Sequence, residues 1–277
     1  MASFVGVYLY KVQTTGHAFT YSIDFTGGTQ VLLQLEKPVG IEKIKKIVED
    51  AGWQGATVRT FSNEREIEVR VKELSSDTKG LAQKIAGTIE TGIESNKITI
   101  LQSDTVTAGG SAGLRWKSIR AITIASLALL AYIAWRFWSF GFAVGAVAAL
   151  LHDVFIVLFV LFIFGREVSN TLIAAILTVL GYSINDTIII FSRIRDNLAA
   201  RSQKSLYQVV NESLNHTLRR TLLTSFSTAL TVIAMLVLGG EALRDFALAL
   251  LVGIIFGTYS SIYIASPIMM LLHKDNK

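Results

Sequence analysis

A carboxylate-bearing segment in the second half of the chain has the residue types for proton chemistry. Residues 181–195 read GYSINDTIIIFSRIR, at the end of a long apolar run, and they carry Asn185 and Asp186 among isoleucines. A carboxylate at the centre of a membrane helix costs roughly 2.5–3.5 kcal/mol on insertion scales, so it needs a partner or water. We therefore interpret Asp186 as a functional residue.

A second acidic residue, Asp153, follows a row of small residues in another apolar run. Gly141, Gly145 and Ala149 recur at four-residue spacing, and Asp153 continues the row. Small residues at this spacing let helices approach closely, so we expect Asp153 to face a neighbouring helix and not lipid. His152 is expected to pack or to form a hydrogen bond, because no other metal ligand has suitable spacing.

A basic residue, Arg220, opens a polar stripe just before residues 221–238. Thr224, Ser227 and Thr231 follow it on one helical face. Other interpretations stay open, since Arg220 can anchor its helix by snorkelling and membrane hydroxyls commonly bond to their own backbone. For each aspartate the alternative is a structural ion pair or a protonated acid held by hydrogen bonds.

Two carboxyl groups and a guanidinium on adjacent helices suit the movement of protons. Removal from water favours the neutral carboxyl and a nearby arginine favours the charged one, so a small change in helix packing can load or release a proton. The proton would be the coupling ion, with no catalytic residue, cofactor or metal. We predict a proton relay of Asp186, Arg220 and Asp153, supported by a polar stripe of Asn185, Thr224 and Ser227.

The composition indicates that these residues lie in a membrane protein. The 277 residues are 51% hydrophobic and 17% charged, below the quarter that is usual for soluble domains. With no cysteine, disulfides, thiol catalysis and thiolate metal sites are excluded. The net charge of +5 is interpreted as membrane topology and not as a nucleic-acid surface. Five apolar runs are long enough to cross a bilayer: residues 119–135, 140–164, 171–191, 221–238 and 246–272.

The basic residues between the third and fourth runs set the predicted topology. The loop 193–220 is rich in arginine and lysine, so we expect it, and by parity the C-terminal tail, in the cytoplasm. Within this loop, residues 205–218 have apolar side chains along one face and predict an amphipathic helix lying on the inner membrane surface.

A soluble domain is expected at residues 11–115, on the outer side of the membrane. Alternation and helical spacing predict strands at 29–35, 56–61, 66–71 and 98–101 and helices at 39–50 and 77–91, a ferredoxin-like βαββαβ order. Residues 108–113, AGGSAG, predict a flexible linker into the membrane region 116–277. Residues 1–10 are apolar but too few to span, and we expect a remnant of a first transmembrane helix.

Several motifs resemble the SecF family, the smaller partner in the bacterial SecD–SecF protein-export complex, which is related to the RND transporters. The matching stretches are SIDFTGGT at 22–29, HDV at 152–154, GYSINDTIIIFSRIRDN at 181–197, TLRRTLLTS at 217–225 and a long one at 239–267. The resemblance covers essentially the whole chain and implies a six-helix plan, with the first helix incomplete here. Ser192 stands where the family commonly has an Asp.

The resemblance implies a membrane subunit that uses the proton gradient to help pull unfolded polypeptides outward. It implies a SecD partner in the bacterial cytoplasmic membrane, acting after the SecYEG channel and SecA have begun the crossing. The family's functional carboxylate corresponds to Asp186, its membrane arginine to Arg220 with Arg219 beside it, and the acid of its HD pair to Asp153.

Three other functions compete with this interpretation. A passive scaffold of the export complex, whose polar residues only pack helices, is the serious rival. An intramembrane aspartyl protease would need a GxGD element, and Asp186 lies in SIND. An RND-type exporter would need a longer chain with two repeats.

Overall fold

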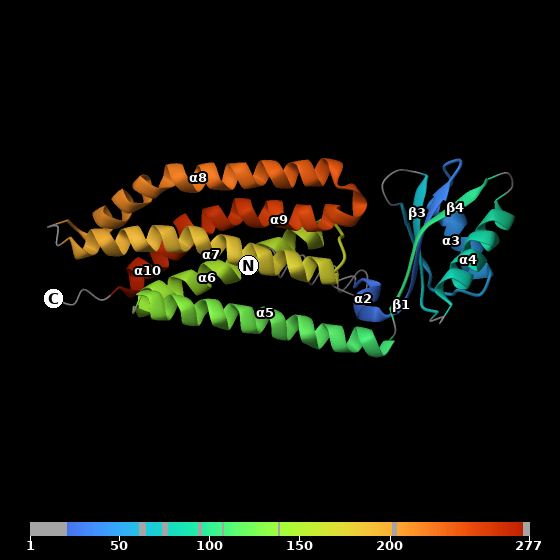
Figure 1. The fold of residues 1–277 in the computed structure, drawn as a ribbon, viewed down its shortest axis with the longest axis horizontal. Helices are drawn as coiled ribbons and strands as arrows, with labels where there is room; N and C mark the ends of the chain where they lie inside the picture. The colour runs from blue at the N-terminus through green and yellow to red at the C-terminus, as the bar shows by residue number, and fades with distance from the viewer. Residues whose placement is uncertain are drawn as a thin grey trace. The chain divides into compact units, whose positions relative to one another are not determined.

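The computed structural model describes residues 21–60, 65–73, 77–93, 96–106, 108–137, 139–200 and 204–273. It contains two compact units, Tyr21–Lys117 and one that includes the chain from Ser118 onward (Figure 1). The predicted helix remnant at residues 1–10 lies outside the described residues.

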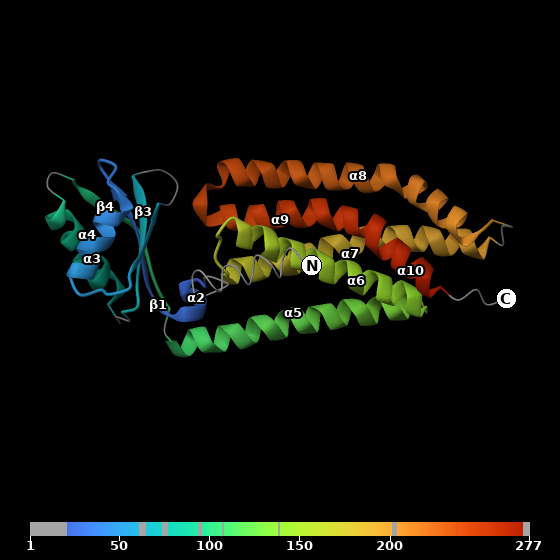
Figure 2. The same cartoon turned by 180° about the vertical axis from the view of Figure 1, so that it is seen from behind.

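The smaller unit is an antiparallel sheet with helices on one face, as both ribbon views show (Figures 1 and 2). In chain order its elements are β1 (Gly28–Leu35), α3 (Ile41–Asp50), β2 (Thr57–Thr60), β3 (Glu66–Val71), α4 (Thr78–Gly92) and β4 (Ile98–Val106). The strand order is β2-β3-β1-β4, with every neighbouring pair antiparallel. Alternate residues of β1, such as Val31 and Leu33, are fully buried, as expected for a strand with one covered face.

The double glycine at the start of β1 has a steric reason. The short helix α2 (Ile23–Thr26) begins at the N-cap Ser22 and ends at Gly27, whose φ is 74°. Gly28 has φ 127°, and a Cβ there would lie 2.6 Å from the carbonyl oxygen of Val71. Only glycine combines that backbone conformation with so close an approach of β3.

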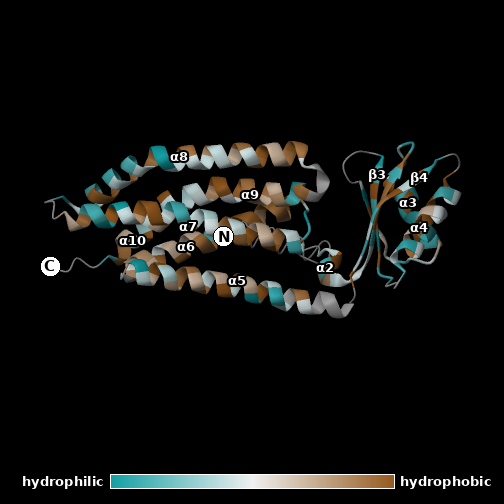
Figure 3. Ribbon diagram, in the orientation of Figure 1, coloured by the Kyte–Doolittle hydropathy of each residue, from teal (hydrophilic) through white to brown (hydrophobic). Residues whose placement is uncertain are grey.

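Five helical segments of the described residues are long and apolar enough to span a membrane. They are α5 (Ala108–Phe137), α6 (Phe140–Ile163), α7 (Asn170–Ala199), α8 (Leu206–Leu238) and a last segment made of α9 (Gly240–Ser260), the π-helix η1 (Ser261–Ala265) and α10 (Ser266–Leu272). Figure 3 shows how strongly apolar residues dominate them. At 1.5 Å per residue the 33-residue α8 is about 50 Å long, well beyond the ~30 Å hydrocarbon layer.

Two predictions about the connections are wrong. Residues 108–113 were expected to form a flexible linker, yet α5 begins at Ala108. Once the apolar span is helical, extending the helix backwards adds one hydrogen bond for each residue fixed, which outweighs the cost of glycines.

The predicted surface helix is also not a separate element. Residues 206–220 are the first turns of α8, and residues 193–199 are the last turns of α7. Ser205 starts α8 with a capping box completed by Gln208, and no glycine or proline interrupts the helix before Gly239. The amphipathic face packs on α7: Asn197 donates to the Ser213 hydroxyl at 2.7 Å.

The small-residue seam of α6 packs where the sequence predicts. A Cβ on Gly141 would lie 3.1 Å from the carbonyl oxygen of Met269, and one on Gly145 would lie 2.5 Å from that of Ala265. In the last membrane segment, a Cβ on Gly253 of α9 would collide with the Val179 side chain of α7. The α9–η1–α10 segment therefore packs between α6 and α7 at glycine contacts, and α9 also contacts α8.

Candidate functional site

Asp153 is fully buried at the junction of three helices. Its Oδ2 accepts a hydrogen bond from Ser183 of α7 at 2.5 Å and one from Ser260 of α9 at 2.9 Å. Its Oδ1 lies 3.1 Å from Nδ1 of the preceding residue, His152. Gly257 makes this junction possible, because a Cβ there would be 3.1 Å from the Ser183 side chain. The prediction that Asp153 faces other helices is confirmed.

The helix changes its hydrogen-bonding period directly after Ser260. The π-helix η1 begins at Ser261, whose hydroxyl lies 2.8 Å from that of Thr187 and donates to the carbonyl of Ser183 at 3.4 Å. Single π-helical turns are rare and occur frequently at functional sites. At the start of this turn, Ser260 contacts Asp153 of α6 and Ser261 contacts Thr187 of α7.

Asp186 lies in a separate buried cluster, between α7, α8 and α9. The hydroxyls of Ser225 and Thr258 each lie 3.4 Å from its Oδ2 and 2.6 Å from one another. Its Oδ1 is shielded from solvent and has no hydrogen-bond partner among the described residues. A proton on Oδ1 would therefore displace no existing hydrogen bond.

No route of side-chain hydrogen bonds joins the two carboxyl groups within the described part of the chain. Ser183 and Thr187 occupy the side of α7 that faces α6 and η1, whereas Asp186 occupies the side that faces α8. The structure thus brings Asp153 and Asp186 onto neighbouring helices but gives each its own set of hydroxyl partners.

Arg220 lies five residues before Ser225 on α8, and its side chain is exposed. It is close enough to Asp186 to act on it electrostatically, but no ion pair links the two within the residues that the structure covers. Its interaction with the carboxyl is therefore one through space and not a hydrogen-bonded pair.

The predicted supporting stripe faces away from Asp186. Asn185, Thr224 and Ser227 are all exposed, and the Thr224 hydroxyl donates to the backbone carbonyl of Arg220 at 3.0 Å. The hydroxyls that reach Asp186 are Ser225, one position along α8 from the predicted row, and Thr258. Neither Ser225 nor Thr258 was among the predicted site residues.

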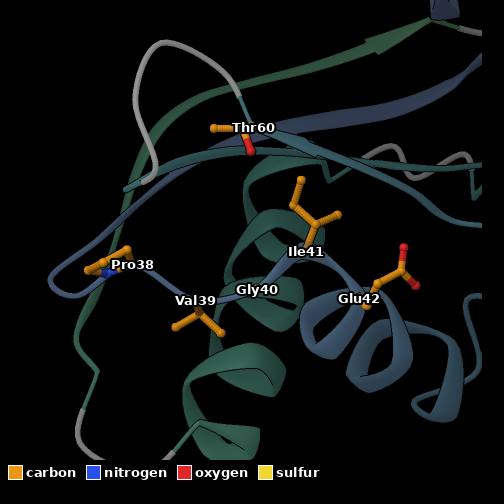
Figure 4. Close-up of a pocket in the computed structure, with 6 residues that line it drawn as sticks. All are labelled: Pro38, Val39, Gly40, Ile41, Glu42 and Thr60. Carbon is orange, nitrogen blue, oxygen red and sulfur yellow. The ribbon is translucent and has the colours of Figure 1, made fainter.

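Two further features offer little chemistry. A hollow of about 690 Å³ in the small unit is lined by Pro38, Val39, Gly40, Ile41, Glu42 and Thr60 (Figure 4). Its lining holds one carboxylate and one hydroxyl, too few for acid–base or metal chemistry. Across the described residues, no group of three or more His, Asp or Glu side chains is arranged to hold a metal ion.

Comparison with known families decides what kind of protein carries this site. The model of the protein export membrane proteins SecD/SecF, C-terminal region, matches residues 86–275, which include Asp153, Asp186 and Arg220. The SecD/SecF GG motif matches residues 15–39, which include Gly27 and Gly28. The chain belongs to the SecD/SecF family. The resemblance to SecF predicted from the motifs is confirmed.

Individual SecF relatives match over most of their length. Protein translocase subunit SecF of Thermodesulfovibrio yellowstonii is 37% identical over 260 residues, covering 92% of this chain and 84% of the relative. The SecF of Vibrio alginolyticus is 39% identical over 262 residues, covering 91% and 80%. This SecF-family chain is therefore a membrane protein of the translocase-subunit type, and it has a role in Sec-dependent protein export.

A longer relative combines the names SecD and SecF in one chain. Protein translocase subunit SecDF of Thermus thermophilus is 39% identical over 265 residues, covering 94% of this chain but 35% of the relative. The crystal structure described as SecDF, a translocon-associated membrane protein, from a Thermus superimposes with a TM-score of 0.84 at 37% identity, covering 98% of this chain and 37% of that one. A SecDF structure in a super-membrane-facing form gives a TM-score of 0.66.

Proposed function

We propose that this SecF-family chain couples the proton motive force to export, with Asp186 as the group that takes up and releases the proton. The observation that carries the proposal is the environment of Asp186. The carboxyl is buried within apolar helices, one oxygen contacts two hydroxyls, and the other has no hydrogen-bond partner among the described residues. Such a carboxyl has hydroxyl donors beside its charged form, and the same hydroxyls can turn to accept from its protonated form.

Arg220 is proposed as the electrostatic partner of this carboxyl. A guanidinium that approaches the carboxylate stabilises the charged form, and one that withdraws leaves the neutral form favoured. Because no ion pair holds Arg220 within the part of the chain described, its exposed side chain is able to move relative to Asp186. Helix movement would thereby load or discharge the proton.

Asp153 is proposed as the second carboxyl of the relay, and its contacts also fit a structural role. Three neighbouring side chains hold it in place, which also suits the structural interpretation of a buried acid. This is the observation that favours the second candidate function, a passive scaffold whose polar residues only tie helices together.

A SecD-type partner is proposed to complete the site. Arg220, Asn185, Thr224 and Ser227 are polar side chains exposed on membrane-spanning helices, and polar groups in such segments normally face protein or water and not lipid. The Thermus SecDF relative carries a region like this chain as 35% of its length, which supports a partner region of the SecD type. The other proposed partners are the SecYEG channel, SecA, an unfolded polypeptide in transit and membrane lipid, with no nucleic acid.

The proposed location is the bacterial cytoplasmic membrane, with the small unit outside and the C-terminus inside. The basic residues in the last turns of α7 and just before α8, among them Arg193, Arg195 and Lys204, support this orientation. The βαββαβ order and the strand order β2-β3-β1-β4 support a ferredoxin-like assignment for the outer domain. The six-helix plan, with a remnant of the first helix at residues 1–10, remains part of the proposal.

The test is release of an exported protein from vesicles that hold this chain, a SecD partner and the Sec channel. We compare the natural chain with Asp186→Asn, which is nearly isosteric, at matched assembly levels. Loss of the gradient-dependent stimulation is the expected result. An unchanged response with normal assembly would remove the proton role from Asp186 and favour the scaffold.

A further inference from the structure

A chain of hydroxyl groups leads from Asp186 toward the surface of the helix bundle. Tyr182, one turn before Asp186 on α7, has its hydroxyl 3.3 Å from that of Thr228 and 3.5 Å from that of Ser225, both on α8. Ser225 in turn lies 2.6 Å from Thr258, and both contact the carboxyl of Asp186. The groups thus form a continuous series across α7, α8 and α9.

The series runs from two buried hydroxyls to a half-buried tyrosine. Ser225 and Thr258 are each about 8% exposed, whereas Tyr182 is half-buried. The Tyr182 ring packs against the apolar cluster around Val232, and its hydroxyl contacts Ser225 and Thr228 of α8. An aromatic ring held in apolar surroundings with a hydrogen-bonding hydroxyl can carry a polar contact across a helix interface.

We propose that Tyr182, Ser225 and Thr258 form the path by which Asp186 exchanges its proton with the outer side of the membrane. The proposal rests on the proton role given to Asp186 above, and it assigns the direction of access to that site. Tyr182 lies one turn closer than Asp186 to the N-terminal end of α7, the end proposed to be outside. Arg220 lies in the first half of α8, toward the end proposed to be inside, so the two sets of groups flank Asp186.

The transfer conserves protons and leaves no charged hydroxyl. A proton from outer water bonds to the Tyr182 oxygen as the tyrosine's own proton moves to Ser225, and the Ser225 proton moves to Oδ2 of Asp186. Three O–H bonds form, and two hydroxyl O–H bonds and the bond in the donating water break. The hydroxyls then rotate back to their starting orientations. Thr258 holds the serine by its 2.6 Å contact and can carry the last transfer in its place.

Asp186 itself can set the direction of these hydroxyls. Ser225 and Thr258 each have a single proton to donate. A charged Asp186 accepts those protons, whereas a protonated Asp186 donates and turns the hydroxyls toward Tyr182 or toward the carbonyl of Ile254, which Thr258 reaches at 3.0 Å. A chain that reverses with the state of the acid is what repeated loading and release require.

The experiment measures proton flux with an internal pH dye in vesicles that hold the full chain, a SecD partner and the Sec channel. The test variants are Tyr182→Phe, which removes one oxygen, and Ser225→Ala. The matched controls are Tyr132→Phe on α5 and Thr178→Val on α7, whose hydroxyl bonds only to its own helix at the carbonyl of Ala174. Asp186→Asn is run beside them.

We expect Ser225→Ala to slow gradient-driven flux by about tenfold or more, the factor that loss of one hydrogen bond to a charged group represents. Tyr182→Phe should slow the flux by about threefold or more, because the tyrosine hydroxyl bonds to neutral hydroxyls. Both controls should match the natural chain. A second readout is the infrared carbonyl stretch of protonated Asp186, identified by its loss in Asp186→Asn. It should persist in Tyr182→Phe and shift in Ser225→Ala.

The two proposals fail in different ways. If Asp186→Asn stops the flux while Tyr182→Phe and Ser225→Ala equal the controls, the hydroxyl path is overturned and the proton role of Asp186 stands. If Asp186→Asn leaves the flux unchanged, both the proton role and the path are overturned. Loss of the infrared band in Tyr182→Phe would also overturn the path, since it would mean that the tyrosine only maintains the structure around the acid.

Discussion

Ser183 of α7 donates a 2.5 Å hydrogen bond to Asp153 of α6, in a place where the carboxyl has no contact with solvent. Ser260 adds a bond from a third helix to the same oxygen. A buried acceptor that loses its donor retains the whole cost of being removed from water. The junction should therefore contribute to stability through Ser183 as well as through the acid.

Replacing Ser183 with alanine should destabilise the helix bundle. We expect a loss of about 1–3 kcal/mol, because Asp153 keeps its burial and loses its shortest hydrogen bond. Heat-induced unfolding in detergent, followed by tryptophan fluorescence, measures the change. Ser227→Ala on the exposed side of α8 is the control and should unfold like the natural chain. Equal unfolding of the two variants would contradict a structural role for the junction.

Replacing Gly145 with alanine should separate α6 from η1. The added Cβ would lie 2.5 Å from the backbone oxygen of Ala265, and backbone cannot move aside as a flexible side chain does. Overpacking of this kind costs about 1–3 kcal/mol, which thermal unfolding in detergent reports. Gly181→Ala, on an open surface of α7, should be neutral or slightly stabilising, because alanine favours helix. A neutral Gly145→Ala would mean that the helices can shift without cost.

The sequence predicts the Gly145 contact but not the Ser225 contact, for a physical reason. Small residues at four-residue spacing have little use in a membrane helix other than close packing, so Gly141 and Gly145 indicate a contact face. On α8 two rows of hydroxyls run side by side, one through Thr224 and one through Ser225. Spacing alone cannot tell which row faces Asp186, because that depends on where α7 and α9 lie.

The sequence predicts individual helices and strands well, but it predicts the connections between them poorly. Alternation in β1 and helical spacing in α4 are local signals, and Asp77 caps α4 as its side chain predicts. The start of α5 and the continuity of α8 depend instead on the neighbouring helical span. Glycines at residues 108–113 and the amphipathic pattern of residues 205–218 are local signals that helix propagation overrides.

Replacing Gly28 with alanine should destabilise the small unit. The position combines a φ of 127° with a Cβ that would lie 2.6 Å from the oxygen of Val71 on β3. Strained backbone of this kind costs about 1–3 kcal/mol before the collision is counted. Pulse proteolysis of the full chain, read at cleavage sites in residues 21–106, measures the loss. Gly40→Ala, where nothing lies within 4 Å, is the control. Equal protection of the two variants would contradict the steric reading of the double glycine.

Replacing Arg220 with lysine should preserve part of the gradient response, and Arg220→Gln should abolish it. Lysine keeps the positive charge that acts on Asp186 through space, but an ammonium does not reproduce the planar fork of the guanidinium. Gradient-dependent release from vesicles, at matched assembly levels, measures both variants. Arg219→Lys is the control, since the adjacent exposed arginine has no assigned contact with the acid and should respond like the natural chain. A full response from Arg220→Gln would show that the proton cycle of Asp186 runs without a neighbouring charge, and the electrostatic role proposed for Arg220 would then be lost.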